Sequence, residues 1–343
     1  MKTQKKYSLI FLLLVLILII LIFTNISLGS IYIPIDGIIG SLTGDESIKS
    51  SWQHIILNYR VPKAITAVIV GSGLGVAGLL MQTLFRNPLA GPYVLGLSSG
   101  ASLGVALVIL GASFFGVNFA SILLSKWSIV IASSIGSFLV LLAVILVSLK
   151  VKDTMAILII GLMFASVTAA IVSVLSYFST AEQLQRYIFW SFGSLGNLAK
   201  EELLILSVIT LIGLIIAILS IKTLNTLLLG DRYAQSLGLN IKNARLAIIL
   251  ATSLLAGSIT AFAGPIAFIG LAVPHLTKLF FDTSNHKYIL PAVLINGAIL
   301  MLICDSIAQL PNTDYTLPIN AVTSLVGAPV VIWLLVRKKK LFV

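Results

Sequence analysis

The sequence has little charge, little histidine and a single cysteine. Charged residues make up 10% of the 343 residues, whereas a soluble domain carries about a quarter. Hydrophobic residues make up 59%, and the mean hydropathy is +1.12. The lone cysteine, Cys304, excludes an internal disulfide, and its apolar neighbours predict a buried packing residue. These values exclude an ordinary soluble globular protein.

Motifs for nucleotides and metals are also missing. No glycine precedes a lysine anywhere, so the chain has no P-loop of its own. Gly73, Gly75 and Gly78 match the spacing of the dinucleotide fingerprint, but they lie in an apolar segment without the required strand. Gly71 and Gly75 instead predict a small-residue face for close helix packing. The three histidines are widely separated, so neither a metal site nor a catalytic cluster is expected.

Apolar segments close to the 20 residues that cross a bilayer as a helix recur along the whole chain. They predict an all-α, polytopic membrane protein with about ten spans. The expected spans are residues 9–23, 62–84, 93–111, 121–149, 154–178, 202–221, 244–262, 265–281, 289–308 and 318–336. The polar, glycine-rich residues 29–58 predict an external loop with a short interfacial helix.

The basic residues are distributed unevenly between the two sides of this bundle. Ten spans place both termini on one side, and 16 of the 22 Lys and Arg residues fall on that side, with 6 on the other. By the positive-inside rule both termini are cytoplasmic. The net charge of +11 is therefore a signal of orientation, and no nucleic-acid partner is expected.

The polar segment Leu227–Asn240, with the sequence LLLGDRYAQSLGLN, lies between two spans on the cytoplasmic side. Asp231 is expected to cap the first turn of a short helix, and Gly238 is expected to close its last turn. The connection of roughly twenty residues is longer than two neighbouring spans require. This indicates that a partner docks there, although an ordinary loop with a helical turn explains the same residues equally well.

Helix-breaking residues gather at 86–96 (RNPLAGPYVLG) and at 263–275 (AGPIAFIGLAVPH), where the span is interrupted by Pro265 and Pro274. Non-helical backbone is tolerated in a membrane only where it is buried in protein or faces water. We therefore expect a large, irregularly packed bundle with a cavity. His275, in the second group, is interpreted as a packing or interface residue rather than a ligand.

A few polar residues fall within the spans. Asp305 is the one candidate intramembrane carboxylate, and without a basic partner in the bilayer core it makes ion coupling a weak hypothesis. Ser166, Ala170 and Ser173 belong to a stripe of small and hydroxyl residues that either packs a neighbour or lines a pathway, with packing favoured. The sequon that begins at Asn25 is interpreted as a chance match.

Taken in order and spacing, the motifs resemble the permeases of type II ABC importers for iron–siderophores, haem and cobalamin, over nearly the whole chain. The motifs include Arg60-Val61-Pro62-Lys63, Arg86-Asn87-Pro88, Leu229-Gly230-Asp231 with Ala234 and Ser236-Leu237-Gly238, Gly264-Pro265, Pro274-His275, and Asp305. The resemblance implies structural roles for Arg86, Asn87, Pro88, Gly264, Pro265, Pro274, His275 and Asp305.

The resemblance also implies roles in transport. A pair of short cytoplasmic helices at residues 227–240, within a coupling segment 222–245, would fit a groove on a separate ATPase subunit. That subunit binds the ATP, so this chain is expected to bind no cofactor. Coupling to the ATPase is then expected at Leu229, Gly230, Asp231, Ala234, Ser236, Leu237 and Gly238. Arg60 and Lys63 are expected to dock a periplasmic or lipid-anchored substrate-binding protein. Ser166, Ala170 and Ser173 would face a pathway between two permease copies.

Several positions depart from the family pattern. Lys63 and Lys278 stand where arginine is frequent, and Gln309 stands where arginine is usual. Thr316 and Asn320 lie in a stretch that usually contains glutamate and glycine. Because lysine lacks the planar fork of arginine, we expect the external docking surface to be weakened or tuned to a different partner.

The sequence therefore predicts a single transmembrane permease domain, residues 1–343, in a homodimeric ABC importer of the inner membrane. The expected cargo is a metal chelate, with iron–siderophore or haem first and cobalamin next. The alternatives are a secondary transporter or channel that needs no ATPase, and a membrane-embedded enzyme, which would need a catalytic cluster. The sequence identifies neither the chelate nor whether the second copy is identical or a paralogue.

Overall fold

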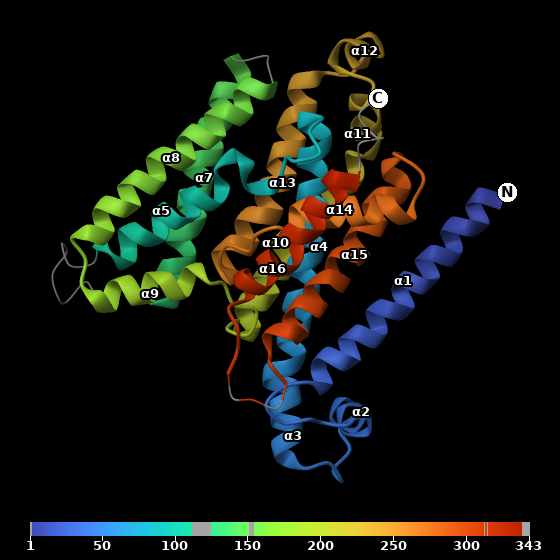
Figure 1. Cartoon of the computed structure of the whole chain (residues 1–343), viewed down its shortest axis with the longest axis vertical. Coiled ribbons are helices and arrows are strands. Elements are labelled where there is room, and N and C mark those ends of the chain that lie inside the picture. Colours follow the sequence, from blue (N-terminus) through green and yellow to red (C-terminus); the bar gives the residue numbers. More distant parts are fainter. Residues whose placement is uncertain (1, 112–124, 151–153, 312, 314, 338–343) are drawn as a thin grey trace. The chain divides into compact units, whose positions relative to one another are not determined.

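The computed structural model describes residues 2–111, 125–150, 154–311, 313 and 315–337. Within these ranges the chain consists of helices joined by short connections, with no strand, which confirms the all-α class (Figure 1). The expected basic residues at 338–340 and the first residues of the span expected at 121–149 lie outside the described part.

The helices form where the sequence is apolar over long stretches, and short polar segments separate them. In chain order they are α1 (Lys2–Ser27), α2 (Ile35–Thr43), α3 (Ser50–Ile55), α4 (Val61–Phe85), α5 (Leu97–Ile109), α7 (Lys126–Lys150), α8 (Thr154–Tyr177), α9 (Ala181–Ser191), α10 (Lys200–Leu219), α11 (Ile221–Leu227), α12 (Asp231–Ser236), α13 (Ile241–Ala263), α14 (Ile269–Phe280), α15 (His286–Ala308) and α16 (Ile319–Arg337). A π-helical turn, η1 (Ile56–Arg60), joins α3 to α4, and a 3-10 turn, η2 (Pro92–Leu95), precedes α5.

Seven helices of the described part are long and apolar enough to cross a membrane. Three shorter apolar helices, Leu97–Ile109, Ile269–Phe280 and Ile319–Trp333, coincide with the remaining expected spans. Each of the ten expected spans therefore corresponds to a helix, and the count of about ten is supported. The span expected at 62–84 begins earlier, because α3, η1 and α4 run without a break from Ser50 to Phe85.

Polar side chains fix where several helices begin. The Thr180 hydroxyl and the Gln183 side chain form a reciprocal capping box at the start of α9. The Asn240 side chain accepts a hydrogen bond from the Asn243 N–H at the start of α13, at 3.2 Å. These caps satisfy N–H groups that have no partner within their own helix.

The chain divides into two compact units. The first comprises Met1–Val76, Ser194–Ser207 and Ile266–Val343, and the second comprises Ala77–Gly193 and Val208–Pro265. The expectation of a single permease domain over the whole chain stays a prediction.

In the first unit, α4 and α15 cross at two glycines. A methyl group added at Gly71 would lie 2.2 Å from the carbonyl oxygen of Gly297, so only glycine permits this approach. Next to the crossing, the Ser72 hydroxyl donates to the carbonyl oxygen of Leu294, at 2.9 Å. A methyl group on Gly75 would meet Val273 and Val293. The expected small-residue packing face at Gly71 and Gly75 is therefore confirmed.

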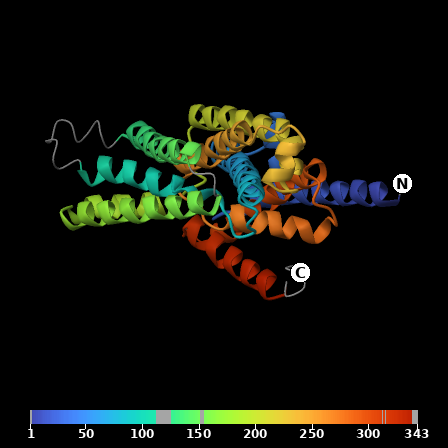
Figure 2. The ribbon, with the colours of Figure 1, turned by 90° about the horizontal axis from the view of Figure 1, so that it is seen from above.

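In the second unit, α5 lies beside α7 and α8 (Figures 1 and 2). The contact between α5 and α7 again depends on small residues. A methyl group on Gly100 would lie 2.5 Å from the carbonyl oxygen of Gly136, and one on Gly104 would lie 2.0 Å from that of Ala132. Backbones this close gain dispersion energy along the whole crossing, which drives helix association in lipid.

Irregular backbone leads into α14, as the breaker residues predicted. Phe268 has a left-handed conformation (φ 64°), and the N–H of Ala267 donates to the side-chain oxygen of Asn320, at 3.0 Å. Asn320 is one of the positions that depart from the family pattern. In this fold it satisfies a backbone group that no helix hydrogen bond reaches.

The glycine crossing in the first unit leads to a prediction for stability. Gly71→Ala should lower the free energy of unfolding by about 2 kcal/mol, because the new methyl group overlaps the backbone of α15. The corresponding fall in melting temperature, measured on the purified protein in detergent, should be about 4 °C or more. Gly257→Ala on α13 is the matched control, since its methyl group meets only an ordinary contact at 3.9 Å. Equal melting temperatures for both variants would contradict the crossing.

Candidate functional site

The segment 222–245 folds as two short helices, α11 (Ile221–Leu227) and α12 (Asp231–Ser236), followed by the start of α13. The resemblance predicted a pair of helices, and both are present. Their position differs from the expectation, because α11 precedes the segment 227–240 and only α12 lies inside it. Both helices belong to the second unit, and the side chains of Leu224, Leu227 and Ala234 are buried in it.

The expectation that Asp231 caps α12 is wrong. Gly230 occupies the capping position with φ 100°, and Asp231 is the first helical residue and makes no capping hydrogen bond. The physical reason is that its carboxylate is taken by two arginines. Arg86 Nη2 lies 2.5 Å from Asp231 Oδ1, and Arg245 Nη2 lies 2.9 Å from Oδ2.

The expected end of the helix at Gly238 is confirmed. Gly238 is left-handed (φ 86°), its N–H donates to the Gln235 carbonyl at 2.9 Å, and the N–H of Leu239 donates to the Ala234 carbonyl at 3.0 Å. This pair of hydrogen bonds is the Schellman arrangement, in which a glycine closes a helix. The Ser236 hydroxyl donates to the Arg232 carbonyl within the same helix, at 3.2 Å.

Four large apolar side chains of this segment are exposed, and Leu228, at 41%, is the least exposed of them. The exposed fractions are 59% for Leu229, 58% for Tyr233 and 60% for Leu237. Leu237 directly follows α12 as its C-cap and comes four residues after Tyr233, so the two side chains lie on the same side of the helix. We refer to Leu229, Tyr233 and Leu237 as the coupling face. Exposed apolar groups on a capped helix are typical of a surface that another protein covers.

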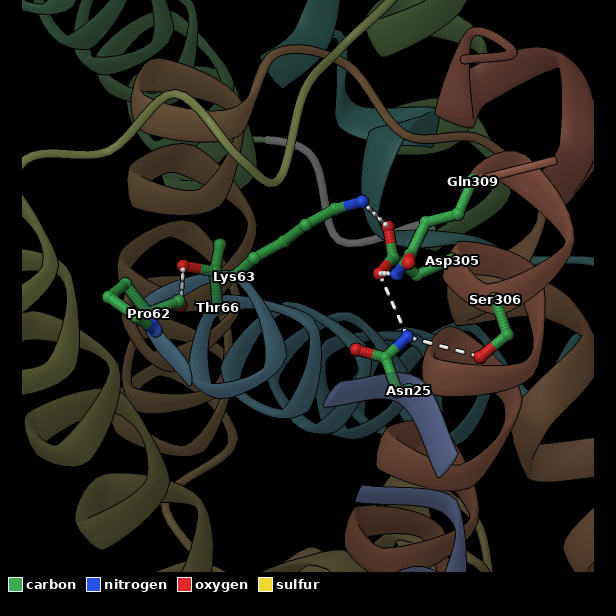
Figure 3. A network of polar contacts seen from close by, with 7 residues as sticks. All are labelled: Asn25, Pro62, Lys63, Thr66, Asp305, Ser306 and Gln309. Atoms are coloured by element: carbon green, nitrogen blue, oxygen red, sulfur yellow. Dashed lines mark hydrogen bonds and ion pairs between the residues drawn. The ribbon is translucent and has the colours of Figure 1, made fainter. Parts of the chain in front are cut away.

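A buried network of polar side chains joins α1, α4 and α15 in the first unit (Figure 3). Lys63 Nζ lies 3.1 Å from Asp305 Oδ1. The side-chain amides of Asn25 and Gln309 each donate to Asp305 Oδ2 at 2.9 Å, and the Asn25 amide also lies 3.1 Å from the Ser306 hydroxyl. Asp305 is 2% exposed. The expectation that Asp305 has no basic partner is therefore wrong.

This network also accounts for two residues whose roles sequence reasoning missed. Asn25, part of the formal sequon, is buried and donates to Asp305, so the sequon is a chance match. Gln309, which stands where the family has arginine, satisfies the same carboxylate. No local pattern could have found these pairs, because Asn25 and Asp305 are 280 positions apart in the chain.

Both residues expected to dock a binding protein have partners within the first unit. The ammonium group of Lys63 is paired with Asp305, and the Lys63 side chain is 23% exposed. The Arg60 guanidinium donates to the carbonyls of Ile26, Ser27 and Ile31 at 2.8, 2.9 and 2.5 Å. Arg60 thus satisfies carbonyls at the end of α1 that have no partner within the helix.

A pocket of about 360 Å³ lies among α5, α8 and α9 of the second unit. Its described lining carries hydroxyl groups and no charged side chain. The residues are Ser98, Ser99, Ser102, Ala165, Thr168, Ala169, Val172, Ser173, Tyr187 and Pro265. Burial raises the pKa of Tyr187, while a hydrogen bond with Ser102 acts in the opposite direction, so the phenol is neutral at physiological pH.

The residues of the expected pathway stripe separate in space. All four residues of this part of α8 are exposed, but only Ser173 and Ala169 line the pocket, and Ser166 and Ala170 do not. Among the structural motifs, Asn87 accepts a hydrogen bond from the Leu89 N–H at 2.9 Å, beside Pro88.

In the second group of breakers, Pro274 lies inside α14, and His275 in the same helix is buried, as expected for a packing residue. Gly264 is left-handed (φ 78°) between α13 and Pro265, and a methyl group there would lie 2.9 Å from the Trp190 carbonyl oxygen.

Known proteins resemble this chain over nearly its whole length. The model of the FecCD transport family matches residues 17–337. The chain is 35% identical over 296 residues to the hemin transport system permease protein HmuU of Yersinia pestis, with 86% of each chain covered. It is 32% identical over 295 residues to the vitamin B12 import system permease protein BtuC of Klebsiella pneumoniae, again with 86% of each chain covered.

A third relative, the molybdate import system permease protein MolB of Haemophilus influenzae, is 31% identical over 281 residues, with 81% of this chain and 79% of the relative covered. Among solved structures, an inward-facing metal-chelate type ABC transporter superposes with a TM-score of 0.82 at 30% identity. The superposition covers 96% of this chain and 99% of that one.

The buried network leads to a prediction for stability. Asp305→Leu should lower the free energy of unfolding by about 3 kcal/mol, because it leaves the Lys63 ammonium without its partner. The double variant Lys63→Met with Asp305→Leu should recover most of this loss, since both charges are then absent. Denaturation of the purified protein in detergent measures both values. A double variant as unstable as the single one would contradict a role for the ion pair.

Proposed function

This chain belongs to the FecCD transport family, and on that premise we propose that it carries a metal chelate through an interface between two identical copies. Members of this family are permease subunits of ABC importers and are not enzymes. They are multi-pass proteins of the inner membrane that work with a separate ATPase and a substrate-binding protein. The chain is accordingly the membrane subunit of an ATP-driven importer.

The coupling face is the observation that carries the proposal. In this proposal Leu229, Tyr233 and Leu237 enter a groove on the ATPase, while Ala234 and Gly238 shape the helix that presents them. ATP is bound by the partner, and this chain binds no cofactor, in keeping with the absence of a P-loop. Closure of two ATPases would then move α12 and shift the access of the pathway.

The proposed cargo is haem or an iron–siderophore first, and cobalamin next. The named relatives belong to systems for hemin, vitamin B12 and molybdate. Family membership therefore does not decide which of these classes of cargo this chain carries. The hydroxyl-lined pocket supports a polar cargo that is held weakly, because hydroxyl groups donate and accept hydrogen bonds without a fixed charge. Weak, uncharged contacts suit a pathway from which the cargo has to leave.

For the outer side, we retain Arg60 and Lys63 as the docking residues of the proposal. An acidic residue of the binding protein would compete with Asp305 for Lys63. A secondary transporter is less well supported, because the carboxylate it would use is already bound by Lys63, Asn25 and Gln309.

The coupling face leads to a prediction for docking. Tyr233→Asp and Leu237→Asp should each reduce capture of the co-expressed ATPase at least tenfold, because a carboxylate would be buried without a partner at the contact. Capture of the ATPase by tagged permease in detergent measures this loss. Tyr32→Asp is the control, since Tyr32 is 60% exposed but lies in the first unit, outside segment 222–245. Normal capture by both α12 variants would refute the docking role.

The pocket leads to a separate prediction for transport. Ser173→Trp should reduce ATP-driven uptake of haemin by proteoliposomes at least fivefold, because the indole fills the pocket, and capture of the ATPase should stay unchanged. Ser166→Trp is the matched control on the same helix, since Ser166 does not line the pocket. Equal uptake by the two variants would exclude the pocket from the pathway.

A further inference from the structure

We propose that Arg86, together with Asp231 and Arg245, is a positioning residue that passes movement of α12 to the ends of α4 and α13. This inference rests on the proposed function and deepens it. Asp231 was expected to cap a helix and to take part in coupling to the ATPase, and Arg86 was expected to have only a structural role. The geometry points instead to a link in which the Asp231 carboxylate binds both arginines.

The Asp231 carboxylate uses each oxygen for a different helix. Oδ1 binds the Arg86 guanidinium at 2.5 Å, directly after the last residue of α4. Oδ2 binds the Arg245 guanidinium at 2.9 Å, in the first turns of α13. Since Asp231 is the first residue of α12, the start of this helix is tied to two long apolar helices at once.

The three side chains are neither buried nor freely exposed. The exposed fractions of the side chains are 44% for Arg86, 29% for Asp231 and 12% for Arg245. An isolated exposed ion pair contributes little to stability. A carboxylate held by two guanidinium groups is constrained in both direction and distance. The arrangement therefore suits a link that maintains geometry more than one that stabilises the fold.

The backbone conformation of Arg86 supports the same role. Arg86 is left-handed, with φ 46°, one of three non-glycine residues with positive φ in the described part of the chain. Its N–H donates to the Thr83 carbonyl at 3.3 Å, and the N–H of Asn87 donates to the Gln82 carbonyl at 3.2 Å. This is the Schellman end of a helix, where glycine fits without strain. An arginine there costs free energy that glycine would not, and its side chain supplies the reason: it reaches Asp231.

Gly230 completes the arrangement. A methyl group at Gly230 would lie 3.3 Å from Arg86 Nη1, and the backbone at Gly230 has φ 100°. The turn before α12 thus approaches the guanidinium closely, and a larger residue would displace it. Gly230 and Asp231 therefore belong to the link, while Leu229, Tyr233 and Leu237 form the surface that the ATPase contacts.

The test uses Arg86→Gly in the full transporter, with the permease, its ATPase and its binding protein in proteoliposomes. Glycine suits the left-handed backbone, so the melting temperature and the capture of the ATPase should match those of the wild type. The amount of haemin taken up per ATP hydrolysed should fall at least fivefold, because α12 then moves without α4. Arg86→Lys retains one charged hydrogen bond and should restore at least half of the wild-type ratio.

Leu310→Gly is the matched control, since Leu310 is also left-handed (φ 42°) and its apolar side chain cannot form an ion pair. It should leave the uptake ratio unchanged. A wild-type ratio in Arg86→Gly overturns the inference. If Arg86→Gly does not fold, Asp231→Asn decides in its place, and a wild-type ratio there also overturns it. Failure of the wild-type chain to bind an ATPase would instead refute the proposed function.

Discussion

Every polar group within a membrane has to find its partner inside the protein, and this requirement shapes the first unit. With no water in the bilayer core, an unsatisfied backbone or charged group costs several kcal/mol. Asp305 is bound by Lys63, Asn25 and Gln309, so one buried charge joins three helices. Arg60 satisfies the end of α1 in the same way. Arg60 and Lys63, the two residues expected to dock a binding protein, therefore bind the end of α1 and Asp305 of α15.

The second unit uses the same chemistry for a different purpose. The pair of arginines on Asp231 is partly open to solvent, so salt and movement can weaken it. A buried pair such as Lys63 and Asp305 is costly to separate and suits a fixed joint. Asp305 thus holds a fixed group of polar contacts within the first unit, and Asp231 holds a partly exposed link at the segment proposed to meet the ATPase.

Sequence reasoning was wrong at both carboxylates, and for the same reason. The capping rule that assigned Asp231 to the amides of α12 considers only residues within one helical turn. The partner that displaces this cap is Arg86, 145 positions away. Asp305 was expected to be unpaired because no basic residue was placed with it in the bilayer core, yet Lys63 of a distant helix reaches it. The stripe on α8 shows the same limit. Ser173 lines the pocket and Ser166 does not, because a periodic pattern does not indicate which part of a helix borders a cavity.

The sequence by itself determined the helical class, about ten spans, the end of α12 at Gly238 and the close packing at Gly71. These follow from composition, periodicity and local backbone preference, which depend on neighbouring residues alone. Only the tertiary structure decided which charges pair, why Arg86 keeps a strained backbone, and which apolar side chains of segment 222–245 remain exposed. Those properties depend on helices far apart in the chain, and a local pattern carries no record of them.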